Sequence, residues 1–194
     1  MYDQVTADPP IPGEDVPLQD CPSLAGKVSR FASGRAIFCA PTEDCGSEGM
    51  HVQTVRSTAT WRGGKARYDT VLLQNGDEDD TMQGMLVGRV LSFLSLVHED
   101  TRYDTALVEW FLPHGEEPDP VTGMWIVRPE MRGGRRHIGL VHTDCIVRGC
   151  HLIGVHGKHR VPRDFHFSSS LDSFNIYYLN HYIDYHAHEY IHHL

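Results

Sequence analysis

Short apolar segments alternate with turn residues along most of the chain after residue 50. These segments are rich in β-branched and aromatic side chains, and Gly, Pro, Asn or Asp residues separate them, which is the pattern of short β-strands. About seven or eight short strands with little helix indicate a partly open β-barrel or a β-sandwich. The strands are expected at residues 51–61, 68–73, 85–97, 105–112, 124–128, 138–141 and 145–155.

Three further segments determine how much helix the predicted fold contains. Residues 85–97 (MLVGRVLSFLSLV) are almost continuously apolar, so we expect a long central strand, with a buried helix as the competing interpretation. Residues 171–180 alternate aromatic and polar side chains and fit a strand or a short helix. Residues 184–193 contain no Gly or Pro and indicate a terminal helix. The predicted fold is mainly β: a partly open barrel with long loops and a short C-terminal helix.

The first 49 residues differ in composition. Residues 1–25 are rich in Pro and Asp, which opposes regular structure. Only residues 35–40 form a short apolar piece, which fits an edge strand or a fragment of a larger protein. We therefore expect a disordered or accessory arm at residues 1–49 and a β-barrel interaction domain at residues 50–194.

Length and cysteine content narrow the class of protein. A chain of 194 residues fits one domain. It has no run of about 18 apolar residues, so we expect no transmembrane helix and no membrane partner. The N-terminus lacks the basic and apolar regions of a secretory signal. Five cysteines, an odd number, favour free thiols in a reducing compartment, either the nucleus or the cytoplasm.

The net charge of −9 is unevenly distributed. Residues 1–130 hold 21 Asp/Glu and 10 Lys/Arg side chains, whereas residues 131–194 hold 5 and 7, with 11 of the 14 histidines. A polyanion such as nucleic acid is therefore expected to contact only the second part, and the alternative is an ordinary solvated surface. The candidate nucleic-acid contacts lie in two basic loops and the segment between them: Arg132, Arg135, Arg136, Arg148, Lys158, His159, Arg160 and Arg163.

The C-terminal sequence HEYIH fits the HExxH pattern, in which two histidines one helical turn apart bind zinc and the glutamate activates water. With His188, Glu189 and His192 in these roles, the chain would be a zinc-dependent hydrolase, which we keep as the alternative function. The match lies in a His-rich segment, where it arises easily by chance, and a third ligand would have to come from upstream. We therefore expect a non-catalytic protein with no cofactor.

A second group of metal-type ligands consists of His142, Asp144, Cys145, Cys150 and His151. On a straight strand Cys145 and His151 share a face but lie too far apart to chelate one ion, while Cys150 and His151 point to opposite faces. We expect buried cysteines and histidines at strand ends instead. No Gly-rich elbow accompanies either cysteine, so nucleophilic catalysis is only weakly indicated.

Aromatic side chains are more numerous than the core of a small barrel needs. A pocket for a peptide or a methylated lysine requires three of them near an acid such as Glu109 or Glu130, and core packing is the default interpretation. The aromatic candidates are Trp110, Phe111, Trp125, Phe165, Phe167, Phe174, Tyr177, Tyr178, Tyr182 and Tyr185.

The order of the segments resembles that of a known group of proteins. RYDTVLL, MLVGRVLSFL, TALVEWF and TGMWIVRPE are followed by HTDCIVRGCHLIGVHG and LDSFNIYYLNHYIDYHAHE. Over about residues 50–190, this order is similar to the C-terminal region of large fungal transposon-encoded proteins of the Plavaka and Kyakuja-Dileera-Zisupton type. Residues 144–157 and 180–189 are the most specific pieces of the resemblance.

More loosely, residues 87–90, 110–111, 143–147 and 175–184 resemble a bromo-adjacent homology (BAH) domain. This implies a BAH- or SH3-like barrel that acts as an interaction module of nuclear proteins. In the transposon-encoded proteins the catalytic core lies upstream of the similar region, so the resemblance implies no DNA cleavage by this chain. We expect a non-catalytic, transposon-derived module that binds a nuclear protein or nucleic acid.

Overall fold

The computed structural model describes Gln19 and residues 26–39, 50–74, 81–157, 161 and 163–192, without the side chains of Cys39 and His192. The chain forms β1 (Ser29–Phe31), β2 (Ser33–Cys39), β3 (Met50–Thr58), β4 (Arg67–Tyr68), β5 (Thr70–Gln74), η2 (Thr81–Gly84), β6 (Met85–His98), β7 (Thr101–Pro113), β8 (Ile126–Pro129), β9 (Met131–Arg132), β10 (Arg135–Arg136), β11 (Ile138–His142), η3 (Thr143–Cys145), β12 (Ile146–Cys150), β13 (Leu152–Gly154), η4 (Phe167–Asp172), β14 (Tyr177–Leu179) and α1 (Tyr185–His192).

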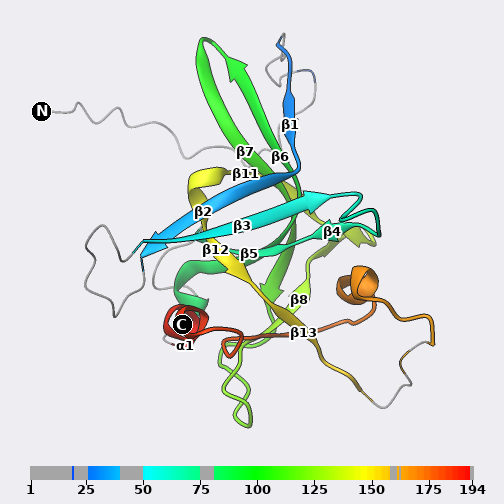
Figure 1. The fold of residues 1–194 in the computed structure, drawn as a ribbon. Helices are drawn as coiled ribbons and strands as arrows, with labels where there is room; N and C mark the ends of the chain where they lie inside the picture. Colours follow the sequence, from blue (N-terminus) through cyan, green and yellow to red (C-terminus); the bar gives the residue numbers. More distant parts are fainter. Residues whose placement is uncertain are drawn as a thin grey trace, which may run out of the picture.

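A long antiparallel hairpin of β6 and β7 is the centre of the fold (Figure 1). The near-continuous apolar segment at residues 85–97 is therefore a strand and not a helix. Its turn places Glu99 and Asp100 at φ 48° and 60°, the left-handed conformation that tight hairpin turns require. The pairing register shifts at Leu91, so the half of the hairpin next to β5 and the half next to β1 are offset.

The main sheet closes almost completely on itself. Its path runs β12-β5-β6-β7-β8-β14-β13, with β1 added beside β6 and β11 beside β7. The two edge strands of this path, β12 and β13, are consecutive in the chain and only His151 joins them. The sheet must therefore curl until its edges meet, which confirms the mainly β, barrel-like fold with a short C-terminal helix.

A second, three-stranded sheet, β2-β3-β4, packs against β12 and β6 (Figure 1). Gln53 of β3 accepts a hydrogen bond from the backbone N–H of Gly149, at 2.8 Å. A Cβ at Gly149 would lie 2.9 Å from the Gln53 amide, so the glycine permits this close approach. Residues 26–39 are part of these sheets, because β1 pairs with β6 and β2 pairs with β3. This part of the predicted arm at residues 1–49 is therefore integrated into the β-structure.

Two apolar clusters fill the molecule, one on each side of the central strands. The first contains Val87 and Phe111 and also receives Ala187 and Ile191 from α1. The second contains Val90 on the opposite face of β6. Alternate residues of one strand thus face different clusters, which explains why β6 is apolar on both faces.

Several local predictions are refined by the structure. The predicted strand at residues 145–155 is broken into η3, β12 and β13, and the pairing of β12 with β5 has a bulge at Val147. Residues 171–180 contain both alternatives, the end of η4 and β14. The basic loop at residues 132–136 is the turn of a β9–β10 hairpin, with Gly133 and Gly134 at positive φ. The predicted terminal helix is α1.

Candidate functional site

A cleft of about 670 Å3 opens beside the point where the barrel closes, a size typical of ligand-binding clefts. Residues of the β3–β4 hairpin form one wall, residues of η4 form another, and the junction of β12 with β13 completes the lining. Figure 1 shows where these elements lie in the fold. The lining includes Trp61, Arg67, Arg89, Cys150, His151 and Phe167.

On the hairpin side Trp61 and Arg67 line the cleft, and two further arginines lie beside Trp61 outside the lining. The guanidinium carbon of Arg56 lies 4.4 Å from the centre of the Trp61 ring, and those of Arg62 and Arg67 lie 5.3 Å from it. Cation–π attraction to the electron-rich ring holds these charges close together. Arg67 also pairs with Asp69 at 2.7 Å, so the one acidic side chain of the lining is neutralised.

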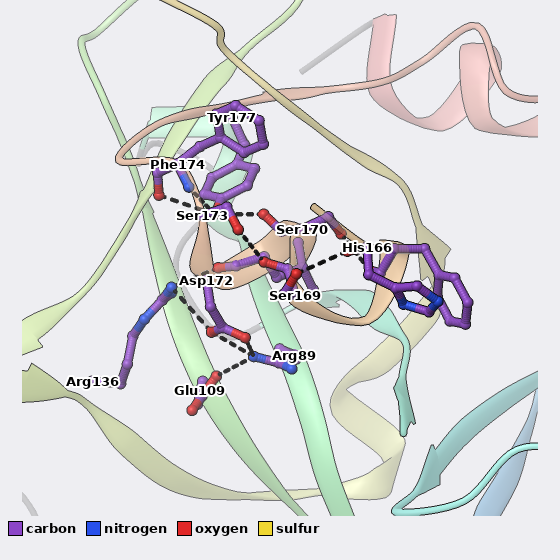
Figure 2. A network of polar contacts seen from close by, with 12 residues as sticks. Arg89, Glu109, Arg136, His166, Ser169, Ser170, Asp172, Ser173, Phe174 and Tyr177 are labelled. Atoms are coloured by element: carbon purple, nitrogen blue, oxygen red, sulfur yellow. Dashed lines mark hydrogen bonds and ion pairs between the residues drawn. The ribbon is translucent and has the colours of Figure 1, made fainter. Parts of the chain in front are cut away.

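A buried ion network fixes the base of the cleft (Figure 2). Arg89 is 8% exposed, and its Nη1 donates to Asp172 at 2.9 Å and to Glu109 at 3.3 Å. Arg136 Nη2 lies 3.5 Å from the Asp172 carboxylate and donates to the Leu171 carbonyl at 2.6 Å. Two cations and two carboxylates balance each other, so the network anchors η4 to β6 and β7 and adds no net charge.

The η4 wall is held by hydrogen bonds of its own. His166 caps the segment by accepting from the Ser168 N–H, and the Ser169 hydroxyl donates to the His166 carbonyl. The Tyr177 hydroxyl donates to the carbonyls of Ser170 and Phe174, as Figure 2 shows. On this fixed support Phe167 is 63% exposed, which is unusual for a phenylalanine.

The ionisable groups at the junction favour their neutral forms. Burial raises the pKa of the Cys150 thiol to about 12, so it is a poor nucleophile at neutral pH. Desolvation lowers the pKa of His151 below its ordinary value of 6.5, so its ring adds no charge to the cleft at pH 7. The Asn180 side chain hydrogen-bonds this ring at 3.1 Å.

The basic residues selected from the sequence do not form one surface. Arg132 and Arg135 are exposed on the β9–β10 hairpin, where Arg132 pairs with Glu130 at 2.8 Å. Arg136 belongs to the network below η4, and Arg163 is exposed just before it. Lys158, His159 and Arg160 lie outside the described residues.

Arg148 needs a correction, because it is a core residue with 1% exposure and cannot contact nucleic acid. Its Nη2 donates to Asp184 at 2.8 Å and its Nε to the Gly149 carbonyl at 3.1 Å. The guanidinium carbon lies 4.9 Å from the centre of the Phe38 ring and 5.9 Å from that of Tyr190. The arginine therefore fastens α1 to the barrel.

The histidines near the C-terminus lie on and around α1. Glu189 is buried, with its carboxylate 3.7 Å from His186 Nδ1, and the ring of His188 lies 5.3 Å from that of His181. The side chain of His192, the third member of the HExxH pattern, lies outside the described residues. Within the described part of the chain, no three His, Cys, Asp or Glu side chains are grouped to hold a metal ion.

The five candidate metal ligands at residues 142–151, for which we expected core packing and strand ends instead of a metal site, are dispersed. His142 and Asp144 form an exposed pair at 3.3 Å in which the His142 ring accepts from the Asp144 N–H and caps η3. Cys145 packs against one apolar cluster and Cys150 against the other. This agrees with the expectation of cysteines packed into the core.

Half of the ten aromatic candidates belong to the apolar clusters or pack against them, and four are exposed at the surface. Phe111, Tyr177, Phe174 and Phe165 form a chain of edge-to-face contacts with ring centres 5.7–6.1 Å apart. The two acids suggested for a cage are already paired, Glu109 with Arg89 and Glu130 with Arg132. Of the ten aromatic candidates, Phe167 is the one among the cleft-lining residues.

The Trp61 cluster is not among the sites predicted from the sequence. A usable signal was nevertheless present. Residues 49–68 contain no Asp or Glu and hold four cations: Arg56, Arg62, Lys65 and Arg67. Residues 145–163 are likewise free of acids and hold Arg148, Lys158, Arg160 and Arg163. Residues of the first stretch line the hairpin side of the cleft, and residues 149–152 of the second line the junction.

Comparison of the chain with protein-family models, with curated proteins and with solved structures finds no match. Among the helices of the described residues, none has the length and apolar character needed to cross a membrane.

Proposed function

We propose that this chain is a non-catalytic interaction module that binds nucleic acid in the cleft between the β3–β4 hairpin and η4. The observation that supports this most is the cluster of arginines around Trp61 at the cleft, in residues 49–68, a stretch that contains no Asp or Glu. The chain has a net charge of −9, so this stretch is a local excess of positive charge in an acidic protein.

Local charge determines whether a polyanion can bind here. Arg62 and Lys65 are exposed at the tip of the hairpin, and Arg56 and Arg67 stand behind them. Among the described residues that line the cleft the one carboxylate is Asp69, which pairs with Arg67, and Asp172 at the end of η4 is shared by two arginines. Acidic groups farther than about 8–10 Å are largely screened at physiological salt, so the neighbouring cations dominate the local potential.

The chemistry of the cleft favours binding over catalysis. Its thiol, Cys150, is held protonated by burial, and the Arg89 carboxylate partners are engaged in ion pairs. The resemblance to transposon-encoded nuclear proteins supports the same proposal and suggests a nuclear location. A protein ligand is the other outcome that the resemblance allows.

The test compares two double variants, each of which removes two cations from one hairpin of the chain. Binding of a fluorescently labelled oligonucleotide, longer than the about 4–16 nucleotides of a typical single-strand site, is measured by anisotropy over a range of salt concentrations. Arg62→Ala with Lys65→Ala should weaken binding and reduce the slope of log K against log[salt] by about 1–2.

The matched control is Arg132→Ala with Arg135→Ala on the β9–β10 hairpin, which should bind as the unmodified protein does. Absence of binding, or affinity independent of salt, refutes the proposed function. Loss confined to the control variant would return the site to the residues predicted from sequence.

A further inference from the structure

We infer that the cleft selects unpaired nucleotides, because Phe167 offers an open ring on which a base can stack. This inference rests on the proposed function and adds to it the strandedness of the ligand and a residue that determines it. Phe167 lines the cleft and is 63% exposed.

The ring of Phe167 is presented by a rigid support. Its neighbour His166 packs against it, with ring centres 4.2 Å apart, and caps η4. The Arg89 and Arg136 pairs with Asp172 hold the same segment on the barrel. A fixed aromatic ring loses little conformational entropy when a base stacks on it, which favours binding.

Across the cleft, the arginines around Trp61 supply cations for the phosphate backbone. Proteins that bind single strands combine such a cationic groove with aromatic stacking platforms, and the stacking tolerates any base because every base has a π-face. In a duplex the base faces are covered by their neighbours in the stack, so Phe167 can reach them only in an unpaired strand. A cleft of about 670 Å3 also has the size of a site for a few flat groups, not for a duplex.

The first experiment needs no variant. A labelled single-stranded oligonucleotide bound to the full chain is competed with the same unlabelled strand, with its duplex, and with poly-glutamate at equal charge. We expect the single strand to compete at least about 10-fold better than either of the others. Equal competition by the duplex overturns the inference, and equal competition by poly-glutamate shows recognition of charge without bases and overturns it as well.

The second experiment tests the residue. Phe167→Ala should weaken single-strand binding by about 5- to 100-fold, the range of one base–aromatic stack, and leave the salt slope unchanged. Phe167→Tyr, which keeps an aromatic ring at this position, should bind the single strand with the affinity of the unmodified protein. Tyr185→Ala is the matched control, since Tyr185 is 66% exposed and lies outside the lining. A loss equal to that of the control refutes the role of Phe167.

The two proposals fail in different ways. If strandedness and Phe167 have no effect while Arg62→Ala with Lys65→Ala still weakens binding, only the inference about unpaired bases is refuted. If no nucleic acid binds, both are refuted.

Discussion

Replacing Asp184 by alanine should destabilise the fold by about 4 kcal/mol, because this carboxylate has two partners. One oxygen accepts from the Ala187 N–H at 2.6 Å, which caps the first turn of α1. The carboxylate also pairs with Arg148 Nη2, at 2.8 and 3.1 Å to its two oxygens. Arg148 is 1% exposed, so its charge is poorly solvated once the partner is removed.

The expected destabilisation by Asp184→Ala is the sum of the lost helix cap and the lost ion pair. Removing an N-cap side chain costs about 1 kcal/mol. Leaving a buried charge unpaired costs about 3–5 kcal/mol, and the lower end applies because the Asp184 side chain is itself 42% exposed and so partly solvated. The sum of about 4 kcal/mol corresponds to a fall in Tm of about 8–16 °C for a chain of this size.

Urea unfolding followed by far-UV circular dichroism measures this free energy, and two further variants separate its parts. Asp184→Asn retains a cap and loses the charge, so it should cost about 3 kcal/mol. Adding Arg148→Met to Asp184→Asn removes the unpaired cation, and the double variant should regain most of that loss. If Asp184→Ala costs no more than the cap, about 1 kcal/mol, the buried charge does not depend on Asp184 and the reasoning is refuted.

Further predictions concern other parts of the molecule. Gly154→Ala should lower stability by about 1–3 kcal/mol in thermal unfolding, because its Cβ would collide with the Phe174 ring, whereas Gly157→Ala, with open space, should not. The free energy of unfolding should fall as pH rises above 9.0, because the Cys150 thiol ionises there in the unfolded chain, whereas its pKa in the folded protein is about 12. Unfolding experiments across this pH range should show a smaller fall for Cys150→Ala. Elemental analysis of the purified protein should find no stoichiometric zinc, and zinc that His188→Ala removes would support the hydrolase alternative.

The strand content could be predicted from the sequence because local pattern determines it. Residues 85–97 were ambiguous between strand and helix, and the ambiguity has a physical origin. Val87 and Val90 of β6 face different apolar clusters, so both faces of the strand are buried and the alternation expected of a half-exposed strand disappears. The β-branched residues and the Gly at position 88 favoured the strand correctly.

The burial of Arg148 could not be predicted, because its partners are distant in sequence. Asp184 lies 36 residues away, and Phe38 belongs to the segment that composition assigned to an accessory arm. The break at His151 depends similarly on the partners of the flanking strands, since β12 pairs with β5 and β13 with β14. Local pattern shows apolar residues on both sides of the break and contains nothing about those partners.

The cleft itself is a consequence of how the barrel closes. β4 leads directly into β5, and β5 pairs with β12, so the cationic β3–β4 hairpin is placed beside the end of β12. There the chain leaves one edge of the sheet and, after His151, joins the other edge as β13. His151 links the two edge strands covalently, but β12 and β13 are not paired by backbone hydrogen bonds. The wall of the barrel is therefore open between them. A barrel sealed by hydrogen bonds between β12 and β13 would bring the same cations together over a convex wall, where a flat base could not enter. The gap in the closure therefore forms the cleft beside the Trp61 cluster, which is where we propose that nucleic acid binds.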